Sequence, residues 1–259
     1  MSQGVFSGDN HYLYYPDESL RGCGNDANNL LLLAKTKLSW PESGLTVLKD
    51  VKAEVEQAAV LAMLSGSQGG NHFIWSHSSH GTNNPDAGQK DGLEELLCCT
   101  DLQEQHGLWA SGYISAKWIG QMVLKVHPQD TLDIILDCCY APAGGQLKAI
   151  GRSYDRARFL PRSEAGIPVD PMAGKLVAGG LPKNVALWSG CQSDQTSADA
   201  YIDNSWQGAF TAAFLKAFKP GRTRVDIIAA ARKWLKDNRY AQIPHLYCGA
   251  VMAQKAVGA

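Results

Sequence analysis

The sequence has no long apolar run and almost no net charge. No apolar stretch approaches the roughly 18 residues that a membrane-spanning helix needs, and 24 Lys and Arg balance 25 Asp and Glu to a formal net charge of -1. A basic excess, which is typical of nucleic-acid-binding proteins, is missing. The first residues, MSQGVFSGDNHY, also lack the basic-then-apolar order of a signal peptide. We therefore expect a cytoplasmic protein that binds neither nucleic acid nor a membrane.

The C-x-x-C spacing of zinc ribbons and thioredoxin-like motifs is absent as well. The chain has seven cysteines, two pairs of which are immediate neighbours: Cys23, Cys98, Cys99, Cys138, Cys139, Cys191 and Cys248. An odd number of thiols without a secretion signal favours reduced cysteines in a reducing compartment.

Short β-like runs alternate with helix-like segments and no internal repeat occurs, which predicts an α/β fold with a mainly parallel sheet. The expected strands cover residues 3–7, 44–48, 71–76, 131–136, 185–189 and 245–251. The expected helices cover residues 25–37, 51–64, 115–127, 206–218 and 224–238. Asn25 or Asp26 is the expected cap of the first helix.

Two segments interrupt this alternation. Residues 81–112 are polar, acidic and turn-rich, and residues 141–183 are rich in Pro and Gly. The second segment carries four arginines, Arg152, Arg156, Arg158 and Arg162. We expect both segments to be loops, and loops of this length inside a compact domain are usually functional or disordered.

Each interrupting segment follows an apolar strand that ends in reactive side chains. HFIWSHSSHG ends in His77 and His80, and LDIILDCCYAP ends in Cys138 and Cys139. Ligands bind beyond the carboxyl ends of parallel strands, and a histidine there can take the proton of a thiol whose usual pKa is near 8.5. The pattern indicates a Cys–His pair for nucleophilic catalysis.

Structural roles compete with this interpretation. Free cysteines are among the most buried residues, so we expect Cys98, Cys191 and Cys248 to be packed in the core. His77 is expected to be a hydrogen-bonded structural histidine. A zinc site made of His77, His80 and the cysteines is conceivable, but the spacing matches no usual zinc pattern.

Several segments resemble the conserved blocks of metacaspases, which are caspase-like cysteine peptidases. SSHG and DCCY resemble the S-G-H-G and D-x-C segments of that family. Four more blocks follow the family order and extend the resemblance over most of the chain: LRGCGNDANNLLLL, SGCQSDQTSADA, GAFTAAFLKAF and QIPHL. The resemblance implies a three-layer caspase-like fold, with a mainly parallel sheet of about six or more strands and helices on both faces.

The resemblance also implies one peptidase domain over residues 1–259. Residues 1–140 would form a large-subunit-like part, 141–183 an Arg-rich processing loop and 184–259 a small-subunit-like part. His80 would be the general base and Cys139 the nucleophile. The amides of Gly81 and Cys139 would form the oxyanion hole, where such donors commonly contribute ~3 kcal/mol each.

By the same resemblance, Asp26 and Asp137, with Ser78 nearby, would form an S1 pocket for Arg or Lys. The residues agree with this role, because extended backbone past Leu136 places Asp137 and Cys139 on one face and Cys138 on the other. Two carboxylates facing one guanidinium also suit arginine. We expect a monomeric cysteine endopeptidase that cleaves proteins or peptides after a basic residue and cuts its own Arg-rich loop.

The chain departs from the family at Ser79, where a glycine is usual, and at residues 140–142, where H-S-G is usual. Many metacaspases need calcium, yet YAPAGGQLKA, after the nucleophile, contains no acid. Other acids are available in the earlier loop: Asp86, Asp91, Glu94, Glu95 and Asp101. Calcium activation is left open, and no cofactor is required for the chemistry. Two rival hypotheses are an inactive caspase-like regulatory or binding module and a thiol-based metal or redox protein.

Overall fold

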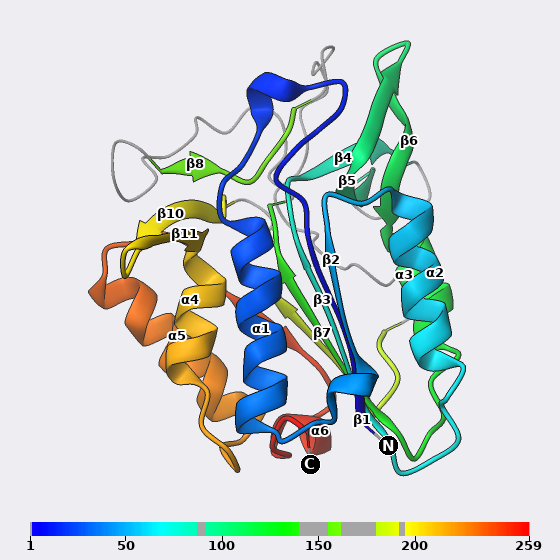
Figure 1. Ribbon diagram of the computed structural model, residues 1–259, viewed down its shortest axis with the longest axis vertical. Coiled ribbons are helices and arrows are strands. Elements are labelled where there is room, and N and C mark those ends of the chain that lie inside the picture. Colours follow the sequence, from blue (N-terminus) through cyan, green and yellow to red (C-terminus); the bar gives the residue numbers. More distant parts are fainter. Residues whose placement is uncertain (1, 87–91, 140–154, 162–179, 192–194, 259) are drawn as a thin grey trace.

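The computed structural model (Figure 1) describes residues 2–86, 92–139, 155–161, 180–191 and 195–258. Its central sheet has six strands in the order β12-β9-β7-β3-β1-β2, and only β12 runs antiparallel to its neighbour. The strands of this sheet are β1 (Ser2–Gly8), β2 (Leu45–Lys49), β3 (His72–Ser78), β7 (Thr131–Asp137), β9 (Val185–Ser189) and β12 (His245–Tyr247). The expected mainly parallel sheet is confirmed, and each expected strand contributes to it.

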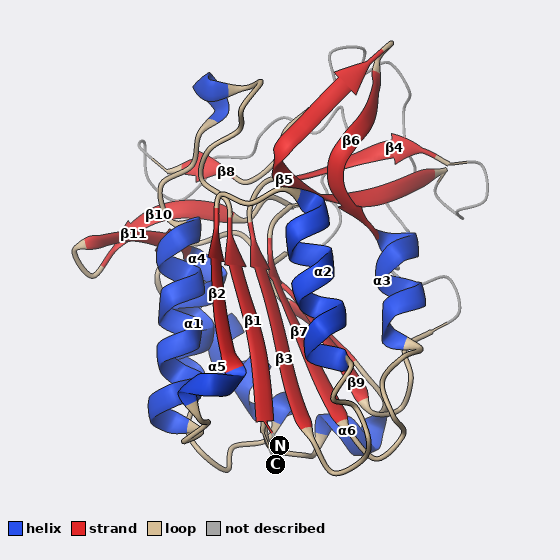
Figure 2. Ribbon diagram, turned by 45° about the vertical axis from the view of Figure 1, so that its right-hand side comes forward, coloured by secondary structure: helices blue, strands red, loops and turns tan. Residues whose placement is uncertain are grey.

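Helices cover both faces of the sheet, which confirms the three-layer architecture (Figure 2). One face carries α1 (Cys23–Lys37), α4 (Ala209–Ala217) and α5 (Arg224–Asp237), and the other carries α2 (Ala53–Leu64) and α3 (Ala116–Val123). Short helical turns complete the set: η1 (Pro16–Glu18), η2 (Glu42–Gly44) and α6 (Ala250–Ala253). All seven residues of β7 are buried, because a central parallel strand is covered on both sides. None of the helices described here is long and apolar enough to cross a bilayer.

The interpretation of residues 81–112 as a loop was wrong. An antiparallel sheet forms there from β4 (Gly81–Pro85), β5 (Leu93–Gln105) and β6 (Leu108–Ser115). Its acidic residues flank an apolar stretch, Leu96 to Cys99, that is fully buried. His106 and Gly107 take positive φ angles of 52° and 75° between the paired residues Gln105 and Leu108, which is the geometry of a tight hairpin turn.

A small sheet near the carboxyl ends of the central strands also escaped prediction. It contains β8 (Arg156–Ala157), β10 (Ala198–Ile202) and β11 (Ser205–Gly208), so α4 begins at Ala209 and not at the expected residue 206. The expected cap of α1 was wrong too. Gly22 occupies the N-cap, and Asp26, one turn further on, directs its side chain elsewhere.

Candidate active site

The ends of β3 and β7 lie side by side, with Ser78 in register with Asp137. His80 and Cys139 each follow two residues later, so both come to the same edge of the sheet. A Cβ atom added at Gly81 would lie 1.8 Å from the Cys139 carbonyl oxygen. Only glycine permits this close approach of the two backbone segments.

The His80 ring is buried and held in one tautomer. Its Nε2 lies 2.7 Å from the Glu18 carbonyl oxygen. A carbonyl can only accept, so Nε2 carries the proton and the lone pair of the neutral ring lies on Nδ1. Nδ1 is buried and has no hydrogen-bond partner. Burial and, to a lesser degree, the charge of Arg158 lower the pKa of His80 to about 4, against the opposing effect of the Glu18 hydrogen bond. The ring is therefore neutral at neutral pH, with a free basic atom.

The Cys139 thiol is turned toward the backbone of Ser197. Its Sγ accepts a hydrogen bond from the Ser197 amide at 2.5 Å and lies 3.4 Å from the Ser197 carbonyl oxygen. Within the described residues, no hydrogen bond joins Cys139 Sγ to the His80 ring. The two side chains thus lie at the same edge of the sheet but are not hydrogen-bonded to each other.

The carbonyl oxygen of Arg158 lies on the two amides expected to form the oxyanion hole. Gly81 N and Cys139 N donate to it at 2.9 and 3.1 Å. The backbone around Arg158 is held on both sides, because Arg158 N donates to Ser197 O at 3.0 Å and Leu160 N donates to Gly81 O at 3.1 Å. The segment therefore lies in the site as an added strand, which is a common way to bind an extended peptide.

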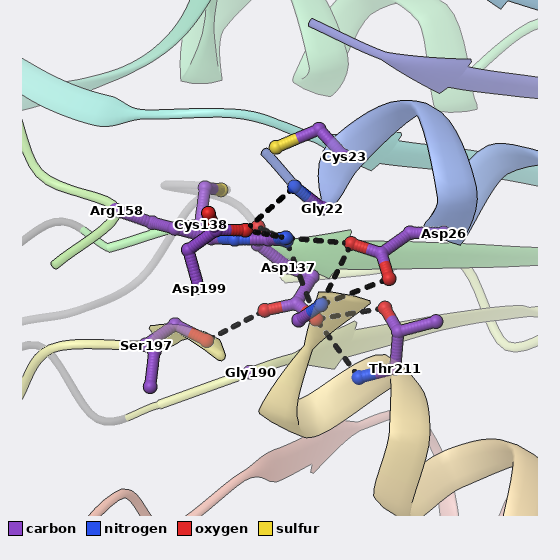
Figure 3. A network of polar contacts seen from close by, with 12 residues as sticks. Gly22, Cys23, Asp26, Asp137, Cys138, Arg158, Gly190, Ser197, Asp199 and Thr211 are labelled. Carbon is purple, nitrogen blue, oxygen red and sulfur yellow. Dashed lines mark hydrogen bonds and ion pairs between the residues drawn. The ribbon is translucent and has the colours of Figure 1, made fainter. Parts of the chain in front are cut away.

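The Arg158 side chain is fully buried among three aspartates, as Figure 3 shows. Its Nη2 lies 2.7 Å from Asp26 Oδ2 and 2.9 Å from Asp199 Oδ1. Its Nη1 lies 3.5 Å from Asp137 Oδ2 and donates to the Asp137 carbonyl oxygen at 3.1 Å. A Cβ atom at Gly208 would lie 2.0 Å from Asp137 Oδ2 and 2.6 Å from Arg158 Nη1, so a larger residue there would close the pocket.

Hydrogen-bond donors hold each of the three carboxylates in place. Asp137 accepts from Thr211 N at 2.8 Å, from Thr211 Oγ1 at 2.7 Å and from Ser197 Oγ at 2.5 Å. Asp26 accepts from Gly208 N at 2.9 Å. Asp199 accepts from two backbone amides just before α1, Arg21 N at 2.9 Å and Gly22 N at 3.0 Å. The pocket is thus built from side chains that cannot easily turn away from a bound cation.

Burial dominates the electrostatics of the pocket. It raises the pKa of Asp26 to about 7, with Asp137 adding to the rise and Arg158 opposing it. Burial disfavours the charged guanidinium, but Cys23 and the three aspartates outweigh this and raise the pKa of Arg158 well above its usual value. The guanidinium of Arg158 therefore stays charged in the pocket.

The remaining expected site residues have other positions. Ser78 is buried at the end of β3, and in the described part of the chain its side chain makes no hydrogen bond to Arg158. Arg156 is exposed, and its Nη1 donates to the carbonyl oxygens of Asp17 and Ser19. Arg152 and Arg162 lie outside the described residues.

Sequence reasoning missed Asp199, Ser197 and Thr211. The first two lie in SGCQSDQTSADA and the third in GAFTAAFLKAF, segments interpreted only as family blocks. The available signal was Asp199 itself, a single acid between two alanines in a stretch that proves to be a buried strand.

Two of the acids considered for calcium, Asp86 and Glu94, pair with one lysine. Lys117 Nζ lies 2.8 Å from Asp86 Oδ2 and 3.6 Å from Glu94 Oε2, and Asp101 Oδ1 accepts from a backbone amide at the start of α2. Asp91 lies outside the described residues. The side chains that can be described do not fit a calcium ion as they stand, so no chemical step is derived through one.

The family profile described as Caspase domain (Peptidase_C14) matches residues 7–254. Metacaspase-1A of Aspergillus niger is 23% identical over 273 residues, which cover 88% of this chain and 66% of that protein. Metacaspase-2 of Arabidopsis thaliana is 26% identical over 222 residues, which cover 79% of this chain and 49% of that protein. The chain therefore spans between about half and two thirds of the length of these relatives.

Two solved structures share the fold. Caspase-1 from Spodoptera frugiperda superposes with a TM-score of 0.59 at 10% sequence identity, covering 95% of this chain and 88% of that one. A protein of Geobacter sulfurreducens superposes with a TM-score of 0.71 at 19% identity, covering 98% of this chain and 97% of that one. At these identities the superpositions establish the fold alone.

Proposed function

The chain belongs to the caspase domain family, and from this premise we propose that it is a metacaspase-type cysteine endopeptidase that cleaves peptide bonds after Arg or Lys. Cys139 is the nucleophile, His80 is the general base, and Asp26, Asp137 and Asp199 select the basic side chain. The substrates are proteins or peptides with a basic residue before the scissile bond.

The way Arg158 is bound is the observation that carries this proposal. Its guanidinium contacts three buried aspartates while its carbonyl oxygen accepts from Gly81 N and Cys139 N. A peptidase specific for basic residues must satisfy these two requirements together: a charge-matched pocket, and amide donors on the carbonyl that becomes negative in the transition state. The site meets both requirements, with Arg158 of the chain itself bound in it.

The chemistry follows from the tautomer of His80. The Cys139 thiol turns from Ser197 toward His80 and gives its proton to the free Nδ1 atom. The thiolate attacks the substrate carbonyl carbon, and the resulting oxyanion is held by the two amides. The C–N bond breaks as the imidazolium returns its proton to the leaving amine, and water then hydrolyses the thioester.

Self-processing is part of the proposal, and the contacts of Arg158 favour the Arg158–Phe159 bond over cleavage after Arg156, the other candidate among the described residues. The Arg156 side chain donates to the backbone near η1 and does not contact the three aspartates. Proteolytic nicking usually occurs in exposed segments. Arg158 has a different property that favours cleavage, because its carbonyl oxygen already accepts hydrogen bonds from the Gly81 and Cys139 amides.

The test is turnover of fluorogenic peptides ending in Arg, Lys or Asp, each with and without calcium, which also settles the open question of calcium activation. We expect turnover of the Arg and Lys peptides, and its loss in Cys139→Ala and His80→Ala. Cys138→Ala is the matched control, because Cys138 packs into the apolar core beside β7. Full activity in Cys139→Ala would disprove the mechanism. A folded wild-type protein without turnover would favour the inactive regulatory module, and a preference for Asp peptides would refute the basic pocket.

A further inference from the structure

A second group of reactive side chains lies near the end of β3 and takes no part in the chemistry above. Asp9 follows β1, Glu56 belongs to α2, His77 lies near the end of β3, and Cys99 lies on β5. All four are fully buried. Each offers one ligand atom, and these atoms all lie within 4.8 Å of one another. Asp, Glu, His and Cys are all established ligands of zinc.

The outer atoms of the group are fixed by neighbours. Trp75 Nε1 donates to Glu56 Oε1 at 2.8 Å, and Val51 N donates to Asp9 Oδ1 at 2.9 Å. Metal ligands typically have their non-coordinating atoms held by such outer hydrogen bonds. The other carboxylate oxygen of Asp9, Oδ2, is buried and without a partner. A buried, unpaired carboxylate oxygen is costly unless a proton or a cation satisfies it.

The orientation of His77 also directs one ring nitrogen at the Glu56 carboxylate. Ser79 Oγ donates to the His80 carbonyl oxygen at 2.6 Å, so it accepts at His77 Nε2, which lies 2.7 Å away. His77 Nε2 therefore carries a proton, and Nδ1 faces both oxygens of Glu56 at 2.9 and 3.0 Å. The lone pair of Nδ1 and the Glu56 carboxylate would repel each other unless a proton or a metal cation lay between or beside them. In the metal-free protein a proton on Nδ1 has this role, and a divalent ion can replace that proton.

We propose that Asp9, Glu56, His77 and Cys99 bind one Zn²⁺ ion in a tetrahedral site. Thiolate and imidazole favour zinc over calcium, which takes six to eight oxygen ligands. Three anionic ligands and one neutral imidazole leave a net charge of -1 around a divalent ion, which is far less unfavourable in a buried site than unpaired carboxylates.

The ion would tie together the end of β1, α2, β3 and β5, close in sequence to the general base His80. His77 is linked through Ser79 to the carbonyl oxygen of His80, so the site would brace the backbone that carries the general base. This is a structural role, and it does not depend on the proposed peptidase activity.

The test measures metal content and needs no substrate. The intact protein is stripped with a chelator, incubated with Zn²⁺, dialysed, and assayed by elemental mass spectrometry. We expect one zinc ion per chain in the wild type and its loss in Cys99→Ser and Asp9→Asn. Cys98→Ser is the matched control, because Cys98 is an equally buried neighbour that packs into a different apolar cluster from Cys99. Cys139→Ala should also keep the ion.

Cobalt provides a readout on the unmodified protein, in case the variants fail to fold. Co²⁺ loaded in place of zinc should give the visible bands of a tetrahedral ion and the near-ultraviolet band of a cobalt–thiolate bond, both in the wild type and in Cys139→Ala. A wild type that retains neither ion would overturn the proposal and leave only a buried ion pair between Glu56 and His77. Loss of the ion in Cys139→Ala, with retention in Cys99→Ser, would move it to the dyad and equally overturn the proposal.

Discussion

Asp199 is the member of the basic pocket with the sharpest test. Its Oδ1 lies 2.9 Å from Arg158 Nη2, in a place where both partners are fully buried. A hydrogen bond to a charged partner contributes roughly 1.5–3 kcal/mol. Asp199→Asn keeps the shape and removes the charge, so we expect kcat/KM for an Arg peptide, relative to that for an uncharged analogue, to fall by about 10- to 150-fold.

The assay compares an Arg peptide with the same peptide containing citrulline, which has nearly the same shape but no charge. Asp199 also accepts from Arg21 N and Gly22 N, so general damage to the site would slow both peptides equally. The Arg-to-citrulline ratio isolates the electrostatic contribution. Asp203→Asn is the control, because Asp203 is exposed and pairs with Lys216 outside the pocket. A ratio unchanged in Asp199→Asn would refute the three-carboxylate pocket.

Three further predictions concern the same site. Arg158→Gln should leave the chain uncut after residue 158, as intact mass spectrometry of aged protein would reveal, and should raise the pKa of His80 in an NMR titration, because the Arg158 charge lowers it. Asp26 has a folded-state pKa of about 7 against an ordinary value of 3.8, so its stabilising contribution is complete below about pH 4 and is lost as the pH rises to about 7. Between pH 4 and pH 7 the free energy of unfolding, measured with a chemical denaturant, should therefore fall by up to about 4 kcal/mol more in the wild type than in Asp26→Asn. Parallel curves of the two proteins against pH would contradict this. Gly81→Ala should abolish turnover, since its Cβ would collide with the Cys139 carbonyl, and normal peptide kinetics would disprove that constraint.

The central sheet could be predicted because its strands are short apolar runs, of which β7 is buried at every position. The convergence of His80 and Cys139 followed from the rule that parallel strands present their carboxyl ends at one edge. The β4–β5–β6 sheet could not be foreseen, because its acids conceal the buried stretch from Leu96 to Cys99. The choice among four arginines was equally inaccessible, since it depends on the path that brings one of them against Asp26, Asp137 and Asp199.

The three aspartates that we propose select a basic substrate also hold Arg158 in place. Removing one partner from a buried ion pair typically costs 3–5 kcal/mol, and three carboxylates without a cation would be less favourable still. The raised pKa of Asp26 indicates how the vacated pocket would respond, namely by taking up a proton. Cutting the Arg158–Phe159 bond would not by itself clear the site, because the new carboxyl end still carries the guanidinium that the aspartates retain. A basic substrate of the proposed peptidase would therefore have to displace Arg158, and its apparent affinity would be reduced by the fraction of molecules in which Arg158 stays bound. The proposed specificity for a basic residue and the restraint of the peptidase would thus have one physical cause, the excess of buried negative charge around a single cation.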